Sequence, residues 1–115
     1  MPMLIYKICP KDMWDAALAA GRFTGAPIDL ADGYIHFSTG EQAVETAQKH
    51  FAGIEGLVLV AVDAASLGDD LKWEESRGGA LFPHLYADLK TSDALWVKPL
   101  PIGDDGNHVF PEFAR

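Results

Sequence analysis

The sequence predicts a single small domain of the α+β class over residues 1–115, with about two to three helices and five or six short strands. Its 115 residues amount to one domain and suffice for one hydrophobic core. A composition of 49% hydrophobic and 23% charged residues is typical of globular proteins. Helical patterns are concentrated in the first half, and helices do not separate the strands regularly. This order favours α+β over a doubly wound α/β arrangement.

The first third of the chain predicts a strand, a helix and a loop. Residues 4–8 form a β-branched and aromatic run that is typical of a strand, with Lys7 on one face. Pro10 then opens a predicted helix that Gly21 ends. The apolar face of this helix consists of Trp14, Ala17 and Leu18. Residues 22–31 show no clear period and predict a loop that is long enough for a lid.

Residues 32–39 are the most informative stretch. The chain turns at Asp32-Gly33 and then alternates with the period of a strand. One face of this predicted strand is core and carries Ile35 and Phe37. The opposite face can support chemistry and carries Tyr34, His36 and Ser38.

Thr39 and Gln42 form a capping-box pattern, so the predicted strand runs directly into the N-terminus of a second helix. The apolar positions of this helix are Ala43, Val44, Ala47 and Phe51. Unpaired N–H groups and the helix dipole favour an anion such as phosphate or pyrophosphate beside Ser38 and Thr39. The alternative interpretation is an ordinary strand-to-helix junction with a hydrogen-bonded histidine.

The second half predicts mainly strands. Residues 57–62 are continuously apolar, which is typical of a strand in the middle of a sheet. Residues 71–74 alternate, and we expect Leu71 and Trp73 to point inward. Residues 63–68 predict a short turn or a single helical turn.

Residues 81–86 predict an edge strand, a bulge or an ordered loop, because Pro83 cannot donate to a sheet ladder. One face of this segment carries Phe82, His84 and Tyr86. Residues 94–97 predict a late strand that Pro99 and Pro101 end. The segment 103–107 is a strong turn signal, across which residues 109–110 are expected to pair back.

Two polar strand faces, one with His36 and one with His84, would line a cleft if they are neighbours in space. Nearby carboxylates of Glu74 and Glu75 suit ribose hydroxyls or proton transfer, and Arg77 suits a phosphate or carboxylate. The alternative for these three charged residues is a solvated turn.

Two other kinds of site are disfavoured by the sequence. A metal site with His36, His84 and His108 lacks close helical spacing and a cysteine pair, so we expect no metal. Ser38 lacks the glycine-flanked elbow of an activated serine. Cys9 has no defined base partner and is interpreted as a packing residue.

The charge and the chain ends limit the partners. A formal net charge of −8 opposes binding that depends on phosphate neutralisation, so we expect no general nucleic-acid binding. The single Cys9 cannot form an internal disulfide. The N-terminal apolar run is short, with no basic leader, and no stretch is long enough to span a membrane. We therefore expect a cytoplasmic protein with a small-molecule ligand and no membrane partner, and the oligomeric state stays open.

Several segments carry a family resemblance. The most specific are Gly33-Tyr34-Ile35-His36-Phe37-Ser38-Thr39 and Phe82-Pro83-His84-Leu85-Tyr86; others are Ile5-Tyr6-Lys7-Ile8, Trp14, Gly21-Arg22-Phe23, Gln42 and Leu71-Lys72-Trp73-Glu74. On these segments the sequence resembles the bacterial and plant family called domain of unknown function 952, over nearly the whole chain. That family has no established reaction and is similar, remotely, to the ADP-ribosyltransferase superfamily, whose members bind NAD in the cleft of a small split β-sheet. The resemblance implies an ADP-ribosyltransferase-like, split, mostly antiparallel sheet and NAD, or a related nucleotide or anionic small molecule, as the ligand.

The resemblance also implies roles for individual residues. Enzymes of that superfamily typically carry a histidine on the first strand, where Lys7 stands here. A lysine still donates hydrogen bonds to a ribose hydroxyl or a phosphate, but it lacks the acceptor of imidazole. The Ser/Thr/Tyr element of the superfamily is matched by Ser38 and Thr39, and Glu74 is the candidate for its late glutamate.

The resulting expectation is cleavage of the nicotinamide–ribose bond, with transfer to a small acceptor or water. Glu74 or Glu75 would stabilise the ribosyl cation, which requires Glu74 to face the cleft. The candidate catalytic residues are Glu74, His36 and His84, and the candidate ligand-binding residues are Lys7, Ser38, Thr39, Arg77 and Tyr86. The alternative is a non-catalytic module that binds a small ligand or a protein.

Overall fold

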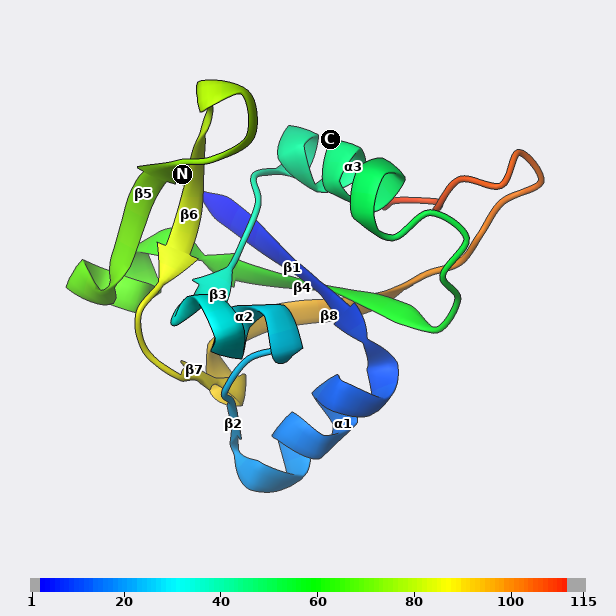
Figure 1. Ribbon diagram of the computed structural model, residues 1–115. Coiled ribbons are helices and arrows are strands. Elements are labelled where there is room, and N and C mark those ends of the chain that lie inside the picture. The colour runs from blue at the N-terminus through cyan, green and yellow to red at the C-terminus, as the bar shows by residue number, and fades with distance from the viewer. Residues whose placement is uncertain (1–2, 112–115) are drawn as a thin grey trace.

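The computed structural model describes residues 3–111, apart from the side chain of Arg77, and has an α+β fold (Figure 1). The α-helices are α1 (Lys11–Ala20), α2 (Pro27–Asp32) and α3 (Gly40–His50). The strands are β1 (Leu4–Pro10), β2 (Arg22–Phe23), β3 (Ile35–His36), β4 (Leu57–Asp63), β5 (Leu71–Glu75), β6 (Leu81–Leu85), β7 (Leu89–Lys90) and β8 (Ala94–Leu100). Short 3-10 turns are η1 (Ala64–Asp70), η2 (Arg77–Gly79) and η3 (Thr91–Asp93). The predicted fold class is confirmed.

The main sheet has the strand order β1-β4-β8, and both of its strand pairs are antiparallel. Its middle strand is β4, the continuously apolar run, as predicted. Both faces of β4 are buried, so the side chains that point to either face are apolar. Val58, Val60 and Val62 pack in the cluster that contains Trp14 of α1. Leu57, Leu59 and Ala61 pack in the cluster that contains Ala43 and Ala47 of α3. Helices α1 and α3 therefore lie on opposite faces of this sheet (Figure 1).

A second sheet has the order β3-β6-β5, again with antiparallel pairs, and the strands β2 and β7 form a separate two-stranded pair. The chain that leaves β3 connects the second sheet to the free edge of β1. The N–H of Tyr6 donates to the carbonyl of Ser38 at 2.7 Å, and the N–H of Ser38 donates to the carbonyl of Tyr6 at 2.9 Å. The two sheets therefore meet at Ser38.

Strand β6 is central in its sheet, so the predicted edge position of Pro83 is wrong. The nitrogen and the carbonyl of one strand residue point to the same side, and the carbonyl of Pro83 accepts from the N–H of Phe37 at 2.9 Å. The missing N–H thus faces the side of β3, which pairs with β6 only through Ile35 and His36. The ladder between β6 and β5 loses no donor.

The predicted loop 22–31 is also wrong, because it contains β2 and most of α2. The start of α2 has Pro27 at a first-turn position, where its missing N–H costs nothing, and Asp29 accepts from the N–H of Ala26 at 2.8 Å. Gly33 ends the helix with a φ of 88°, a left-handed conformation that favours glycine. The helix is only six residues long, so its periodic signal is weak.

Two predicted core residues are exposed. Helix α1 buries Trp14 and Ala17 in the core and packs Met13 against it, whereas the neighbouring Leu18 is 54% exposed. Trp73 is 36% exposed because β5 is an edge strand, and the core covers that face only as far as Leu71.

The end of the described chain largely follows the prediction. Strand β8 continues through Pro99, which an edge strand tolerates, and ends at Leu100, directly before Pro101. The turn at 103–107 closes with a hydrogen bond from the N–H of Gly103 to the carbonyl of Asn107, at 2.8 Å. Val109 pairs back through its N–H to the carbonyl of Pro101, also at 2.8 Å. Within residues 3–111, no helix is both long and apolar enough to cross a membrane.

Candidate functional site

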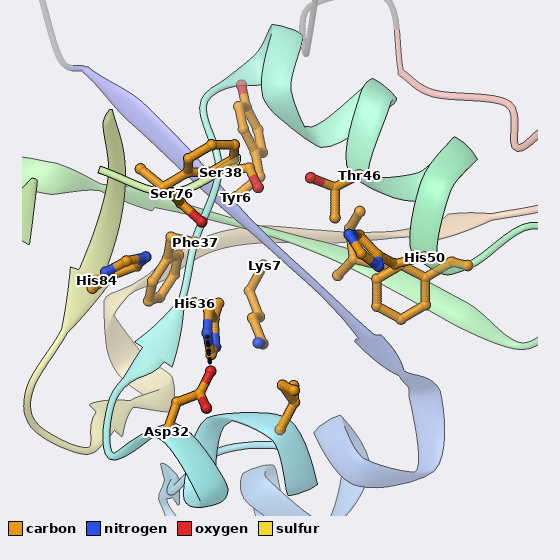
Figure 2. Close-up of a pocket in the computed structure, with 14 residues that line it drawn as sticks. Tyr6, Lys7, Asp32, His36, Phe37, Ser38, Thr46, His50, Ser76 and His84 are labelled. Atoms are coloured by element: carbon orange, nitrogen blue, oxygen red, sulfur yellow. Dashed lines mark ion pairs between the residues drawn. The ribbon is translucent and has the colours of Figure 1, made fainter. Parts of the chain in front are cut away.

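A pocket of about 490 Å³ lies where the two sheets meet (Figure 2). Strand β1 contributes residues from one side, β3 and β6 from another, and the helices α2 and α3 complete the lining. The lining residues are Tyr6, Lys7, Ile8, Ile28, Asp32, His36, Phe37, Ser38, Thr46, His50, Phe51, Ser76, Phe82 and His84.

The pocket brings together four of the candidate residues: Lys7, His36, Ser38 and His84. These come from β1, from β3 and the residues that follow it, and from β6, which confirms that the two polar strand faces are neighbours. His36 and His84 are direct cross-strand partners, and their ring centroids are 5.4 Å apart.

Three other candidates lie outside the pocket lining. Thr39, Glu74 and Tyr86 do not line the pocket. Thr39 instead caps α3: its hydroxyl accepts from the N–H of Gln42 at 3.3 Å, and its own N–H donates to Oε1 of Gln42 at 3.1 Å, so the predicted capping box is confirmed. The side chain of Arg77 lies outside the described part of the structure.

Beside the pocket, Asp29 is the centre of a buried charged network. Its carboxylate accepts from the ammonium of Lys7 at 2.9 Å on Oδ1 and 2.8 Å on Oδ2. It also accepts from the N–H of Ala26 and the N–H of His36, and its Oδ1 lies 2.6 Å from Nδ1 of His36. The network therefore joins α2 to both β1 and β3.

Burial and ion pairing shift the pKa values of Asp29 and Lys7 in opposite directions. Burial by itself would raise the pKa of Asp29, but the hydrogen bond with His36 and the charge of Lys7 outweigh it and lower the pKa to about 2. For Lys7, burial dominates and lowers the pKa of the ammonium, although Asp29 opposes that change.

Both ring nitrogens of His36 are engaged by carboxylates. Nδ1 meets Asp29, and Nε2 lies 2.9 Å from Oδ2 of Asp32, an ion pair that Figure 2 marks with a dashed line. His36 thus has no free ring nitrogen for a ligand. Its role in this geometry is to hold α2 against β3 and to place Asp32 at the pocket.

His84 has a different environment. Its Nδ1 lies 2.9 Å from Oε1 of Glu74, and the same oxygen accepts from the hydroxyl of Tyr86 at 2.7 Å. Tyr34 stacks on the His84 ring, with centroids 4.1 Å apart. Glu74 therefore contacts the ring of His84 and does not itself line the pocket.

These hydrogen bonds shift the pKa values of two groups, Glu74 and Tyr86. Those from Tyr86 and His84 hold the pKa of Glu74 below its ordinary value. The hydrogen bond to Glu74 in turn raises the pKa of Tyr86 to about 12, because it stabilises the protonated phenol.

Sequence reasoning missed Asp29 and did not assign Asp32 to the site. Both lie in α2 or at its end, in the segment that we interpreted as a loop and a turn. The available signal was an acidic residue two positions after Pro27, in the first turn of a helix. His50, the last residue of α3, also lines the pocket.

The remaining candidates do not form a site. Cys9 is buried, and burial raises the pKa of its thiol to about 11, which fits a packing residue. His108 does not line the pocket, and its Nε2 lies 2.8 Å from the carbonyl of Ile54. Over residues 3–111, no group of three or more His, Cys, Asp or Glu side chains could hold a metal ion.

Comparisons with known proteins place the chain among relatives of the same fold. The model of a family described as "Protein of unknown function (DUF952)" matches residues 8–97. The crystal structure of protein CC0527 from Caulobacter crescentus is 54% identical, with a TM-score of 0.92, over 96% of this chain and 97% of that chain. A solution NMR structure of CC0527 matches with 57% identity and a TM-score of 0.84, over 91% and 90% of the two chains. No curated protein matches the chain.

Proposed function

The chain belongs to the DUF952 family, and on that premise we propose that its pocket binds a small polar molecule of nucleotide type, with NAD as the first candidate. The observation that carries this proposal is the convergence of Lys7, His36, Ser38 and His84 on one pocket of about 490 Å³. Small-molecule sites commonly have volumes of roughly 300–1,000 Å³ and combine apolar walls with a few polar groups.

The lining suits a ligand that carries both hydroxyl groups and a ring. The carboxylate of Asp32 accepts hydrogen bonds from hydroxyls, and the hydroxyl of Ser38 donates or accepts. The aromatic rings of Phe37 and Phe82 offer apolar surface to a base or a nicotinamide ring. A nucleoside presents this combination of groups.

We take NAD as the first candidate because of the sequence resemblance to ADP-ribosyltransferases; Lys7, which stands where those enzymes carry a histidine, lines the pocket. Enzymatic cleavage of NAD is a separate part of the proposal. Glu74 acts on the pocket only through His84, because its Oε1 is bound by His84 and Tyr86. Stabilisation of a ribosyl cation would then depend on Asp32 and on the pocket-facing side of His84.

A non-catalytic binding module is the second candidate. The observation in its favour is that Asp29 and Asp32 already neutralise Lys7 and His36 within the protein. Polar groups that satisfy one another stabilise a fold and do not by themselves imply turnover.

The test is a thermal-shift titration with NAD, ADP-ribose and nicotinamide, together with an assay for released nicotinamide. A ligand at 100 times its Kd stabilises the native state by roughly 2.7 kcal/mol, so saturable binding of NAD raises the melting temperature. We expect His84→Ala to lose this shift and His108→Ala, which changes a histidine outside the pocket, to keep it. Circular dichroism checks that both variants fold.

Two results would contradict the proposal. If none of the three compounds raises the melting temperature of the wild-type protein, the ligand is not of the NAD class. If NAD raises the melting temperature of His84→Ala as much as that of the wild type, NAD binds elsewhere. Binding without any release of nicotinamide would favour the non-catalytic module.

A further inference from the structure

His84 is a buried histidine that uses only one of its ring nitrogens. Its side chain is 4% exposed, and Nδ1 is paired with Oε1 of Glu74. Among the described residues, no hydrogen-bond partner of Nε2 is found, although the ring lines the pocket (Figure 2). A buried polar atom without a partner is uncommon in proteins, because leaving it unpaired costs free energy.

We propose that Glu74 and His84 form a proton-accepting dyad, in which Nε2 of His84 is a general base toward a hydroxyl group or a water molecule held in the pocket. This inference deepens the proposed function, since it rests on the pocket holding a ligand, and it names the group that loses the proton as a hydroxyl or a water molecule in the pocket. In these terms His84 is the catalytic residue, and Glu74 is a positioning residue.

The geometry supplies what such a step requires. Nδ1–H donates to the Glu74 carboxylate, which selects the tautomer whose Nε2 carries a lone pair. When Nε2 takes the proton, the O–H bond breaks and the oxygen keeps the electron pair, which makes it a nucleophile. The ring becomes an imidazolium, and the adjacent carboxylate of Glu74 stabilises its positive charge.

The surrounding residues keep this arrangement in one orientation. Tyr86 donates to the same Oε1 of Glu74, and Tyr34 stacks on the His84 ring at 4.1 Å. Lys72 is the cross-strand partner of His84 in β5 and is the nearby cation that acts on Glu74. His84 is therefore oriented by Glu74 of β5, by Tyr86, which follows β6, and by Tyr34, the residue before β3.

A comparison with His36 separates two histidines that the sequence treats alike. His36 is the more exposed of the two, at 31%, but both of its nitrogens face carboxylates. His84 is less exposed, and no described residue forms a hydrogen bond with its Nε2. We therefore expect the reactivity of each histidine to depend on whether a ring nitrogen is unpaired, and not on how exposed the ring is.

The first experiment measures the free protein and needs no ligand. Long-range ¹H–¹⁵N NMR spectra at about pH 8 should show His84 as the Nδ1–H tautomer. Diethyl pyrocarbonate, with mass spectrometry to locate the adduct, should modify His84 at Nε2. We expect His36 to react at least about tenfold more slowly, because both of its ring nitrogens are engaged. A His84→Gln variant identifies the NMR signals.

Two substitutions of Glu74 test its positioning role. Glu74→Gln keeps an oxygen that accepts from Nδ1–H but removes the charge, so the tautomer should remain while the rate of modification falls. Glu74→Ala removes both the accepting oxygen and the charge, so the imidazole of His84 should become a mixture of the two tautomers. Tyr86→Phe, which leaves the carboxylate in place, should keep the tautomer. If Glu74 had only a structural role, these variants would not differ in the tautomer of His84 or in its rate of modification.

The outcomes distinguish the dyad from the proposed ligand. An Nε2–H tautomer in the wild type, or a modification rate that Glu74→Gln and Glu74→Ala leave unchanged, would overturn the dyad even if NAD binds. The expected tautomer and reactivity without any NAD binding would support the dyad and refute NAD as the ligand. If NAD is cleaved, Glu74→Gln should lower kcat with little change in the Kd for NAD.

Discussion

Lys7 and Asp29, which are 22 positions apart, form a buried ion pair through both carboxylate oxygens, at 2.9 and 2.8 Å. Lys7 is 5% exposed and Asp29 1%. Moving two charges out of water is costly, and the pair offsets this cost only while both partners are present. The pair connects α2 to β1 and so fixes one wall of the pocket.

Removing one partner of this pair should be strongly destabilising. Asp29→Ala leaves Lys7 buried without its counter-ion, and we expect the free energy of unfolding to fall by about 3–5 kcal/mol. The matched control is Asp15→Ala, because Asp15 pairs with Lys11 at 2.6 Å in an exposed i,i+4 arrangement. That change should cost less than about 1 kcal/mol. Urea denaturation measures both, and equal losses would contradict the assigned role of Asp29.

Asp29 should also make stability depend on pH in the acid range. Its pKa is about 2 in the folded protein against an ordinary value of 3.8. The unfolded chain therefore binds the proton more readily, so the stabilisation is complete above about pH 4 and is lost as the pH falls toward about 2. The difference corresponds to about 2 kcal/mol. Urea midpoints across this range should fall less steeply for Asp29→Asn, whose amide does not titrate; an equally steep fall would refute the assignment.

Thr39 should be important for stability rather than for ligand binding. Thr39→Ala removes the hydroxyl that accepts from the N–H of Gln42, and loss of such a cap costs about 1 kcal/mol. Thr39→Ser keeps the oxygen and should be close to the wild type. Urea denaturation and the NAD titration measure the two effects separately. A large loss of affinity in Thr39→Ala with an unchanged midpoint would mean that Thr39 contacts the ligand.

Cys9 should be unreactive in the native protein. It is buried, its pKa is about 11, and it is the single cysteine, so one thiol assay reports on it alone. At about pH 8 the thiol stays protonated and covered, and only the thiolate is nucleophilic. Modification by 5,5′-dithiobis(2-nitrobenzoic acid) should be slow in buffer and fast in concentrated urea. A rapid stoichiometric reaction in buffer would show that Cys9 is accessible.

Much of the fold was accessible from local sequence patterns. The apolar run 57–62 specified a strand that is buried on both faces, because no residue in it tolerates solvent on either side. Thr39 and Gln42 specified the start of α3, since the capping box involves only residues three positions apart. The polar face that contains His36 and Ser38 was also visible, as period-two alternation is local.

Other features depend on contacts between distant residues. Pro83 is tolerated in a central strand because β3 ends beside it, and no local pattern contains the length of a neighbouring strand. Asp29 became a site residue through contacts with Lys7 and His36. Local signals for a helix of six residues are weak, so the burial of Asp29 in α2 could not be anticipated.

The sequence by itself determined the α+β class, the strand and helix on either side of Thr39, and two of the three histidines that line the pocket, His36 and His84. These follow from periodicity and capping, which act over a few neighbouring residues. Only the tertiary structure decided that carboxylates engage both ring nitrogens of His36, while one nitrogen of His84 has no partner among the described residues. The same holds for Glu74, which contacts the ring of His84 and does not itself line the pocket. The reason is physical: hydrogen bonds and burial depend on which distant groups meet, and a strand pattern specifies the face of a side chain but not its partner.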